Sequence, residues 1–505
     1  PCCEWCTIHT MYDLCVIGGG INGVGIARDA AGRGYKVILV EQGDLASVTS
    51  SASTKLIHGG LRYLEQFAFR LVRESLRERE VLCQMAPHLV HPLRFILPHQ
   101  NSVRPAWMVR AGLFLYDHLG GEQNLSGSRM ENLREGSLGK FLRPELKRGF
   151  SYSDCRVDDA RLVILNAVDA AQRGAVILTR TMCEKIIPDC GAWAVHLKDL
   201  LSDESGEVRA KYVVNAAGPY VRDVLDHSNL SIPNQTPRLR LVQGSHIVVP
   251  SLFEGDHAYI LQQPDRRVVF AIPYEGRFTL IGTTDTEFTG DARGACVTEA
   301  EQDYLCAAVN RYFLSSVTTN QIIWSYSGVR ALFDDGRKNA RSVTRDYHLY
   351  PQRKDGSYIL SVFGGKLTTY RKLSEQVCDL LDAEGFSSEG PWTDKVPLSG
   401  GDFGGLDFMA FLNQQAVKWP NIPPDMLRRL AGSYGTIMDR ILAKPMGKDL
   451  GDGLVESEVR YLVEEEWAQT PEDILWRRSK LGLHISEETR RALESFMSSS
   501  RFEKA

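Results

Sequence analysis

The first apolar run of the chain is short, and the pattern of apolar positions changes directly after it. Residues 12–17 are mostly apolar and rich in β-formers, which favours a buried strand. Apolar positions then recur at helical spacing up to Gly34, and a second apolar run covers 36–40. This order predicts a strand–helix–strand unit at the start of the fold.

The turn between the first strand and the helix fits the pattern G-x-G-x-x-G. Gly18 permits the tight turn, Gly20 lets the backbone approach a pyrophosphate, and Gly23, one residue after Asn22, lets the helix pack close to the strand. The second strand ends at Glu41, which can accept hydrogen bonds from both ribose hydroxyls of an adenosine. Its charge would repel a 2′-phosphate. The unit therefore predicts a dinucleotide other than NADP, and by itself it does not separate FAD from NAD.

Two further strand–glycine–helix units lie far along the chain. One ends at Gly218, and the other runs from the apolar segment 358–363 into the turn 364–369. Between them, 236–330 alternates between apolar and polar residues as half-buried strands do. An NAD domain is built from contiguous βαβ units, whereas these units are widely separated, so the pattern favours FAD.

From this organisation we expect an α/β protein (α+β overall) with a Rossmann-like FAD-binding domain assembled from discontinuous segments, an inserted β-rich substrate domain and a C-terminal helical domain. The FAD-binding domain takes 11–90, 150–235 and 330–395, the substrate and membrane-facing domain takes 91–149 and 236–329, and the helical domain takes 400–505. Residues 1–10 precede a natural start at Met11 and lack the regions of a signal peptide. We expect them to be an extension that is not native.

One segment, 92–119, leaves two interpretations open. Its arginines and its apolar residues, among them Trp107 and Phe114, suit a helix at a membrane interface, and they suit an internal helix equally well. No apolar run reaches the roughly 18 residues that a membrane span needs. By contrast, 66–85 is typical of a charged amphipathic helix on a solvated surface.

Charge and cysteine usage exclude several classes. A net charge of −4 gives no basis for binding nucleic acid. The 11 cysteines are scattered and odd in number, which fits reduced thiols in a cytosol-facing protein better than a disulfide framework. The chain has no zinc-type spacing of Cys and His and no G-x-S-x-G motif, so we expect no metal and no serine nucleophile.

The candidate chemistry follows Glu41 and recurs in the third glycine turn. The polar loop after Glu41 can donate hydrogen bonds to a pyrophosphate and a flavin edge through Ser50, Ser51, Thr54 and Lys55, and His58 and Gly60 can lie against a flat ring. In the turn that contains Gly365, Lys366, Leu367 and Thr368, a helix N-terminus and a lysine charge would stabilise negative charge on a reduced flavin.

Arginines and histidines complete the set of candidates. Arg62, Arg330 and Arg345 occur in turn-like contexts, and their planar guanidinium groups match phosphate or carboxylate oxygens. Three such residues favour an anionic substrate, although each arginine can equally pair with a neighbouring acid. His58 and His246 are candidate general bases because an unperturbed histidine titrates near pH ~6.5. A lone histidine is more often structural.

These motifs resemble those of the FAD-dependent glycerol-3-phosphate dehydrogenases, and the bacterial respiratory branch is the most similar. The resemblance rests on 18–23, 50–65, 244–250, 281–285, 326–330 and 363–372, and it covers nearly the whole chain after 1–10. It implies oxidation of sn-glycerol 3-phosphate to dihydroxyacetone phosphate, by hydride transfer from C2 to N5 of FAD. It assigns the substrate to Arg62, Tyr63, Arg330 and Arg345, and places Lys366 between substrate and flavin.

The resemblance also implies partners and a location. Electrons would pass to a quinone, and the protein would attach peripherally to the inner face of the cytoplasmic membrane, otherwise in the cytoplasm, as a homodimer. It does not say whether His58 or His246 is the base. Two other functions stay open, an oxidase that reduces O₂ and a non-catalytic dinucleotide-binding redox sensor.

Overall fold

The computed structural model describes residues 11–99, 104–121, 124–334 and 346–499. Its first sheet has a parallel core in the order β18-β10-β1-β2-β7. The strands are β1 (Met11–Ile17), β2 (Val37–Val40), β7 (Val176–Leu178), β10 (Ser205–Asn215) and β18 (Ser357–Phe363). β17 (His348–Lys354) pairs antiparallel with β18, and the hairpin of β8 (Thr181–Asp189) and β9 (Ala192–Asp199) pairs with β10.

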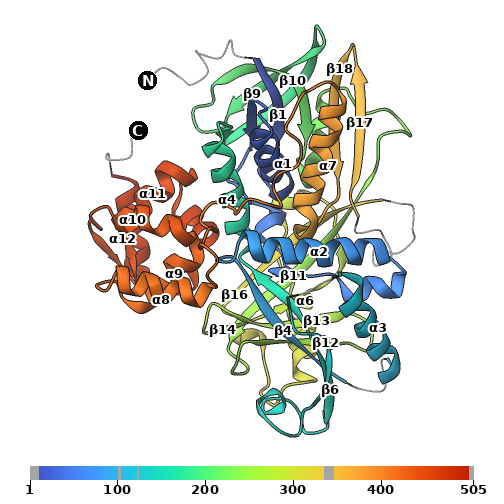
Figure 1. Cartoon of the computed structure of the whole chain (residues 1–505), viewed down its shortest axis with the longest axis vertical. Helices are drawn as coiled ribbons and strands as arrows, with labels where there is room; N and C mark the ends of the chain where they lie inside the picture. Colours follow the sequence, from blue (N-terminus) through green and yellow to red (C-terminus); the bar gives the residue numbers. More distant parts are fainter. Residues whose placement is uncertain (1–10, 100–103, 122–123, 335–345, 500–505) are drawn as a thin grey trace.

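Both faces of this sheet are covered, which explains the nearly continuous apolar runs in its strands. Leu14 and Val16 pack toward α1 (Ile21–Gly32), α4 (Asp159–Gln172) and α7 (Tyr370–Ala383). Cys15 and Ile17 point to the other face, which the β8–β9 hairpin and α5 (Val221–His227) cover. Figure 1 shows α1, α4 and α7 beside the strands β1, β10 and β18.

The parallel strands end at one edge of the sheet, and their C-terminal ends carry the motifs. β1 runs into Gly18, β2 into Glu41, β10 into the turn at Gly218, and β18 into Gly364. In open α/β sheets ligands bind outside the carboxyl ends of the strands. Segments that are far apart in the sequence therefore meet at this edge, as a discontinuous FAD-binding domain requires.

The second sheet is largely antiparallel, in the order β15-β11-β14-β13-β12-β4-β6-β3, with β16 on β11 and β5 on β6. Its strands are β3 (Leu56–Ile57), β4 (Val90–Pro98), β5 (Arg129–Asn132), β6 (Arg148–Val157), β11 (Leu239–Pro250), β12 (His257–Gln262), β13 (Val268–Tyr274), β14 (Phe278–Gly282), β15 (Thr286–Glu287) and β16 (Trp324–Phe333). α6 (Glu299–Asn310) packs on one face, and α2 (Phe69–Met85) and α3 (Ala106–Leu119) pack on the other.

Two of the boundaries drawn from the sequence cut strands of this sheet. β6 crosses the boundary at 150 and β16 crosses the one at 330, and both strands belong to the second sheet. The reason is long-range pairing: β6 pairs with β4 along nine residues, and β16 pairs with β11 along ten. Local patterns do not reveal such partners.

The C-terminal part is a mainly helical domain beside α4 (Figure 1). It comprises α8 (Phe408–Lys418), α9 (Pro424–Tyr434), α10 (Met438–Leu442), α11 (Glu456–Glu466), a π-helical segment Asp473–Arg478 and α12 (Glu487–Met497), with a small hairpin of β19 (Asp449–Gly451) and β20 (Leu454–Val455). Its apolar residues continue the core that contains α1 and α4. The fold class expected from the sequence is confirmed.

The segment that left two interpretations open contains β4 and α3. Val109, Leu113 and Tyr116 of α3 are buried, whereas Trp107 and Phe114 are exposed. The helix is thus partly internal and partly at the surface. Among the residues that the structure describes, no helix is long and apolar enough to cross a bilayer.

Candidate functional site

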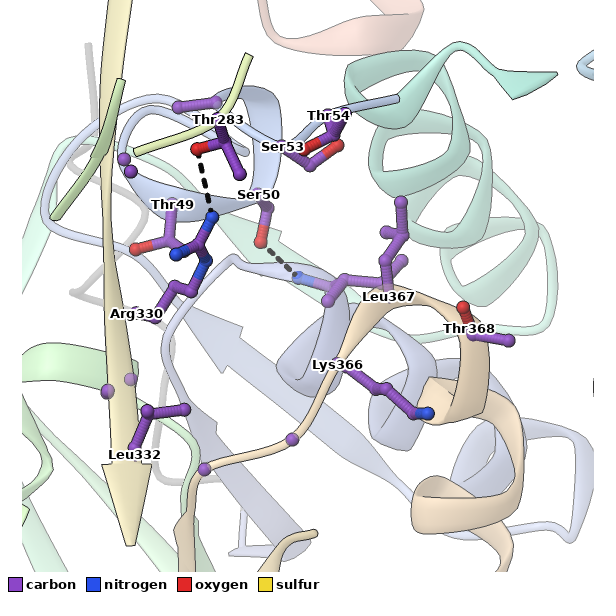
Figure 2. A pocket seen from close by; sticks show the side chains of 18 of the residues that line it. Thr49, Ser50, Ser53, Thr54, Thr283, Arg330, Leu332, Lys366, Leu367 and Thr368 are labelled. Atoms are coloured by element: carbon purple, nitrogen blue, oxygen red, sulfur yellow. Dashed lines mark hydrogen bonds between the residues drawn. The ribbon is translucent and has the colours of Figure 1, made fainter. Parts of the chain in front are cut away.

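A cavity of about 1670 Å³ lies where the motif-bearing turns of the first sheet face the second sheet. It is lined by the fingerprint turn, the polar loop 46–54 apart from Ser51, the segment 60–65, the turn at Gly218 and the turn 364–368. Strands of the second sheet, with Arg330 on β16, complete the lining. Figure 2 shows the side chain of Thr49 beside Arg330, Ser50 near the centre of the view, Thr54 at the upper right and the turn with Lys366 below.

Glycine is favoured at each of the three fingerprint positions for a different steric reason. Gly18 has a φ of +113°, and a Cβ there would lie 2.6 Å from the carbonyl oxygen of Ala216. A Cβ on Gly23 would lie 1.8 Å from the carbonyl oxygen of Gly18, so only glycine lets the helix approach the turn. Gly20 lines the cavity. A side chain at position 20 would intrude toward Ser50, whose Oγ lies 3.1 Å from the Cβ position.

Glu41 lies at the cavity wall, with its carboxylate held by backbone amides. The N–H of Gly19 donates to Oε2 at 2.6 Å, and the N–H of Gly43 donates to Oε1 at 2.6 Å. Burial raises the pKa of the carboxyl, and these two donors act in the opposite direction. The carboxylate thus ties the end of β2 to the fingerprint turn.

The polar loop after Glu41 divides between the cavity and the protein interior. Ser50 lines the cavity, and its Oγ accepts from the N–H of Ile21 at 3.0 Å, the hydrogen bond drawn in Figure 2. Ser51 and Lys55 do not line it. The Lys55 ammonium is buried and donates to Asp159 at 2.8 Å and to the carbonyl of Ser51 at 3.0 Å. Contrary to the expectation, Lys55 lies in an internal ion pair.

The turn after β18 requires its two glycines, because Gly364 has a φ of +83° and Gly365 a φ of +101°. The amide of Asn22 donates to the carbonyl of Gly364 at 3.2 Å and joins this turn to the fingerprint. Lys366 lines the cavity, donates to Oγ of Ser75, and lies with Nζ 5.0 Å from the ring centroid of Tyr63. Leu367 and Thr368 follow in a 3-10 turn that leads into α7, and both line the cavity.

Two of the predicted arginines meet at one carboxylate. Arg330 donates from Nη1 to Oδ1 of Asp285 at 2.6 Å and from Nη2 to Oγ1 of Thr283 at 3.1 Å, the second of which Figure 2 draws. Nη1 of Arg62 lies 3.7 Å from the other oxygen of Asp285. All four residues line the cavity. Arg345 lies outside the described residues.

Neither Thr283 nor Asp285 was singled out as a site residue from the sequence. Both belong to 281–285, a segment that carries part of the resemblance, and that was the signal available. The sequence does not reveal that this segment, at the end of β14, lies opposite two arginines from other elements.

The two candidate histidines occupy different environments. His58 lines the cavity, and its backbone N–H donates to Oγ1 of Thr368 at 3.3 Å. His246 is buried behind Thr54, whose hydroxyl lies 2.9 Å from Nε2, and its ring stacks on Tyr326 at 4.8 Å. Burial, together with the charges of Arg330 and Lys55, holds the pKa of His246 well below 6.5. Its imidazole is therefore neutral at pH 7.

The two glycines after His58 serve packing. A Cβ on Gly59 would lie 2.5 Å from Leu76 and 2.7 Å from the hydroxyl of Tyr116, so Gly59 faces the protein. Gly60 lines the cavity with a φ of +79°, and a Cβ there would lie 2.2 Å from the ring of Tyr63. Close packing and a left-handed backbone, rather than room for a flat ring alone, explain the pair.

Comparison with known proteins gives matches over nearly the entire chain. Residues 13–371 match the model of the FAD dependent oxidoreductase family, and 391–499 match the C-terminal domain of alpha-glycerophosphate oxidase. A glycerol-3-phosphate dehydrogenase of Pseudomonas aeruginosa is 51% identical, with 97% of this chain and 95% of the relative covered. The chain belongs to the FAD-dependent glycerol-3-phosphate dehydrogenase family.

Another relative is named for a different substrate. A D-erythritol 1-phosphate dehydrogenase of Brucella abortus is 48% identical, with 95% of this chain and 96% of the relative covered. Among solved structures, the glycerol-3-phosphate dehydrogenase of Bacillus halodurans complexed with FAD is 33% identical at a TM-score of 0.78, with 97% of this chain and 90% of that one covered. The family predicted from the sequence is confirmed, and so is FAD as its cofactor.

The residues present fit FAD, as membership of this dehydrogenase family requires. Gly18, Gly20 and Glu41 offer a dinucleotide end, and 364–368 lies at the same cavity. Oδ1 of Asn22 is buried and has no hydrogen-bond partner within the described residues, so it is an acceptor available to a ligand group. Gly218 lines the cavity with a φ of +57°, at the carboxyl end of β10.

Proposed function

We propose that the protein oxidises sn-glycerol 3-phosphate to dihydroxyacetone phosphate. The observation that carries the proposal is the pair Arg62 and Arg330, which reach one carboxylate from two elements inside the cavity of the dinucleotide fingerprint. Arginine guanidinium groups match phosphate oxygens in charge and geometry. The 51% identical relative named glycerol-3-phosphate dehydrogenase supports the same substrate.

The phosphate of the substrate would bind where Asp285 now pairs with the arginines. Asp285 and the guanidinium of Arg330 are partly exposed to the cavity, so an incoming dianion can compete with the carboxylate. Tyr63 and Lys366 lie at the same cavity. The substrate's phosphate would then lie at β16 and its carbon chain would point toward the turn 364–368. Arg345, outside the described residues, stays a predicted ligand.

Bound FAD supplies the hydride acceptor, N5, for the hydrogen on C2. The chain's residues must take the proton of the C2 hydroxyl, and His58 suits this role because it lines the cavity. His246 is neutral, but it does not line the cavity and instead contacts the hydroxyl of Thr54, which does. We therefore place His58 as the base and His246 as the residue that orients Thr54. The charge of Lys366 would stabilise negative charge that develops beside the turn.

A second candidate substrate is D-erythritol 1-phosphate, which the name of the 48% identical relative favours. It shares the phosphate that the arginines would bind and differs in the length of the polyol. Both substrates should therefore be compared at equal concentration in the same assay.

The decisive experiment is anaerobic mixing of the FAD-loaded protein with each phosphorylated polyol. Bleaching of the flavin absorbance near 450 nm by glycerol 3-phosphate is the expected result, with unphosphorylated glycerol as the control. Faster bleaching by erythritol 1-phosphate would transfer the proposal to that substrate. Absence of bleaching by either would favour the non-catalytic redox sensor.

We further propose that the electrons pass to a lipophilic acceptor, a quinone, and the lining of the same cavity favours this acceptor. The lining contributed by 61–67, α3 and the second sheet is largely apolar and includes Phe95, Met108, Leu115 and Phe270. Reduction of a short-chain quinone without stoichiometric peroxide is the expected result. Peroxide formed in proportion to substrate, with no quinone reduction, would make the protein an oxidase.

Exposed aromatic residues close to this apolar lining support peripheral attachment to a membrane. Phe67 and Trp107 are more than 70% exposed, and Phe69, Phe114 and Leu115 are also exposed. The helices α2 and α3 and the turn Leu61–Gln66, near which these residues lie, contact one another. A cluster of exposed apolar side chains at one place marks an interaction surface. We place this surface on the inner face of the cytoplasmic membrane.

Vesicle co-sedimentation tests the attachment. The double variant Phe67→Ser/Trp107→Ser should lose binding to vesicles of phosphatidylglycerol and phosphatidylcholine while anaerobic flavin bleaching persists. Val417→Ser, at an 82% exposed position on α8, is the matched control and should bind as the unmodified protein does. Equal binding by all three proteins would remove this surface from the proposal.

The homodimer stays a prediction, which light scattering after size exclusion tests.

A further inference from the structure

A buried carboxylate joins the C-terminal domain to the loop that follows Glu41. Asp44 accepts hydrogen bonds from Nε of Arg477 and Nη1 of Arg478, and from Nη2 of Arg478 at 2.8 Å. The side chains of Asp44 and Arg478 are fully buried. Arg478 also donates to the backbone carbonyl of Glu466, at the end of α11. Two C-terminal arginines thus fix a single residue of the FAD-binding domain.

Asp44 lies in the loop 41–47, which the fingerprint turn also holds. The N–H of Ala46 donates to the carbonyl of Gly19 at 3.1 Å. The carboxylate of Glu41 accepts from the N–H groups of Gly19 and Gly43. Since these contacts join the loop to the turn at Gly19, a displacement of Asp44 is transmitted to the Glu41 end of the cavity.

A second connection reaches the same loop from β7 and β8. The backbone N–H of Arg180 donates to the carbonyl of Gly43 at 2.9 Å. Both oxygens of Asp473 accept from the Arg180 side chain at 2.9 Å, and Arg477 also donates to Asp473. The loop is therefore held to the segment Asp473–Arg478 through Asp44 and through Arg180.

The same segment contacts the second sheet. The ring of Trp476 stacks on Trp324 of β16, with 4.6 Å between the centroids. β16 also carries Arg330. The segment Asp473–Arg478 therefore contacts both the loop 41–47 and β16, and both of these contribute residues to the cavity lining.

We propose that the C-terminal helical domain positions the adenosine end of the FAD site, with Arg477 and Arg478 acting through Asp44 on the loop of Glu41. The inference rests on the predicted contact between Glu41 and the adenosine ribose. Docking of the domain and binding of FAD are then linked: each stabilises the other, since both depend on one conformation of the loop 41–47. The arginines are positioning residues and do not touch the substrate.

The test measures release of FAD from the FAD-loaded protein, after dilution, by recovery of flavin fluorescence. Arg477→Gln removes one arginine from Asp44 and from Asp473 at a partly exposed position and leaves Arg478 in place, so the buried carboxylate of Asp44 keeps one partner. We expect FAD release at least 10-fold faster than in the unmodified protein, and Arg477→Lys should restore part of the difference. Asp44→Asn, at the other partner of the same contact, should act in the same direction.

The matched control is Arg429→Gln. Arg429 forms a two-point ion pair with Glu458 inside the C-terminal domain, at 2.6 and 2.7 Å, and neither residue lines the cavity. The variant Arg429→Gln should lower the thermal midpoint of unfolding, and it should release FAD no faster than the unmodified protein. Equal release by Arg477→Gln and the unmodified protein, or equally fast release by Arg429→Gln, would overturn the proposal. Because release is measured without substrate, failure here leaves the bleaching result for glycerol 3-phosphate unaffected.

Discussion

Asp285 and Asp44 each lie between two arginines, and these two clusters differ in burial. Asp285 lies with Arg62 and Arg330 in the cavity wall, where the guanidinium side chains are 32% and 25% exposed. Asp44 lies with Arg477 and Arg478 in the interior, where the carboxylate and the Arg478 side chain are fully buried. Each cluster consists of one aspartate and two arginines, but the arginines of the first are partly exposed to the cavity and the second lies in the interior.

The comparison shows how burial determines what an ion pair can do. Around Asp285 the arginines remain accessible from the cavity, so an anionic ligand can replace the carboxylate at modest cost. Around Asp44 a charge left without its partner would be buried in a low-dielectric interior, which is strongly unfavourable. The first cluster is suited to exchange of partners and hence to binding, whereas the second fixes two domains together.

The largest effect should come from removing the buried aspartate. Asp44→Ala leaves Arg478 buried without its carboxylate and should lower the free energy of unfolding by about 3–5 kcal/mol. Asp285→Ala should lower it by about 1 kcal/mol or less, because water in the cavity can solvate the arginines. Urea unfolding followed by circular dichroism measures both. Equal losses in the two variants would show that the two clusters do not differ in this way.

Arg330→Ala should weaken substrate binding and leave stability almost unchanged, whereas Asp44→Ala should mainly lower stability. The apparent KM for glycerol 3-phosphate should rise about 10- to 150-fold, because a hydrogen bond to a charged group contributes about 1.5–3 kcal/mol. The midpoint of thermal unfolding should change little. Steady-state reduction of an artificial dye measures KM, and an unchanged KM would remove Arg330 from the phosphate site.

The sequence predicted what depends on local sterics. Gly23 is required by its contact with the carbonyl oxygen of Gly18 within one strand–turn–helix unit, and Gly18 has a φ of +113°, so the local pattern was sufficient to place the fingerprint. The contact between position 18 and Ala216 is long-range, and the pattern does not reveal it. Lys55 shows the limit of this approach. It lies in the polar loop as predicted, yet its ammonium pairs with Asp159, which is 104 residues away and enters from the start of α4. No spacing rule reveals that partner.

The same limit applies to the domain boundaries and to the clusters of charge. The predicted boundaries at 150 and 330 fall inside β6 and β16, because the strands that pair with them lie elsewhere in the sequence. The C-terminal segment gave helical periodicity and no obvious catalytic cluster, although it holds Asp44 through contacts that span more than 430 residues. Long-range charge pairing of this kind is visible only in three dimensions.

Acid should weaken the C-terminal contacts through Asp473. Burial alone would raise its pKa, but Arg477, the N–H of Gln469 and Arg180 together lower the pKa to about 2. A carboxyl with a depressed folded-state pKa adds stability above its unfolded pKa of about 3.9, and that stability is lost as the pH falls toward 2. From the lowered pKa, we expect a contribution of about 2 kcal/mol at pH 7.

The measurement compares the unmodified protein with Asp473→Asn in urea at several pH values. The difference in free energy of unfolding should be constant from pH 7 to pH 5 and should shrink below about pH 4. Asp285→Asn serves as the comparison from the cavity cluster. A difference for Asp473→Asn that persists unchanged to pH 3 would contradict the assigned role of the ionised carboxylate.

The smallest expected effect distinguishes a competing carboxylate from a positioning one. If Asp285 occupies the arginines until phosphate arrives, Asp285→Asn should tighten binding of inorganic phosphate by several-fold, because a neutral amide neither repels the dianion nor pairs with it in competition. Isothermal titration of the FAD-loaded protein measures the dissociation constant, with Arg330→Ala as the non-binding control. Weaker binding by Asp285→Asn would instead mean that the carboxylate holds Arg62 and Arg330 in the geometry that phosphate needs. The cavity cluster would then fix its arginines as Asp44 does in the interior, and exposure alone would not separate the two.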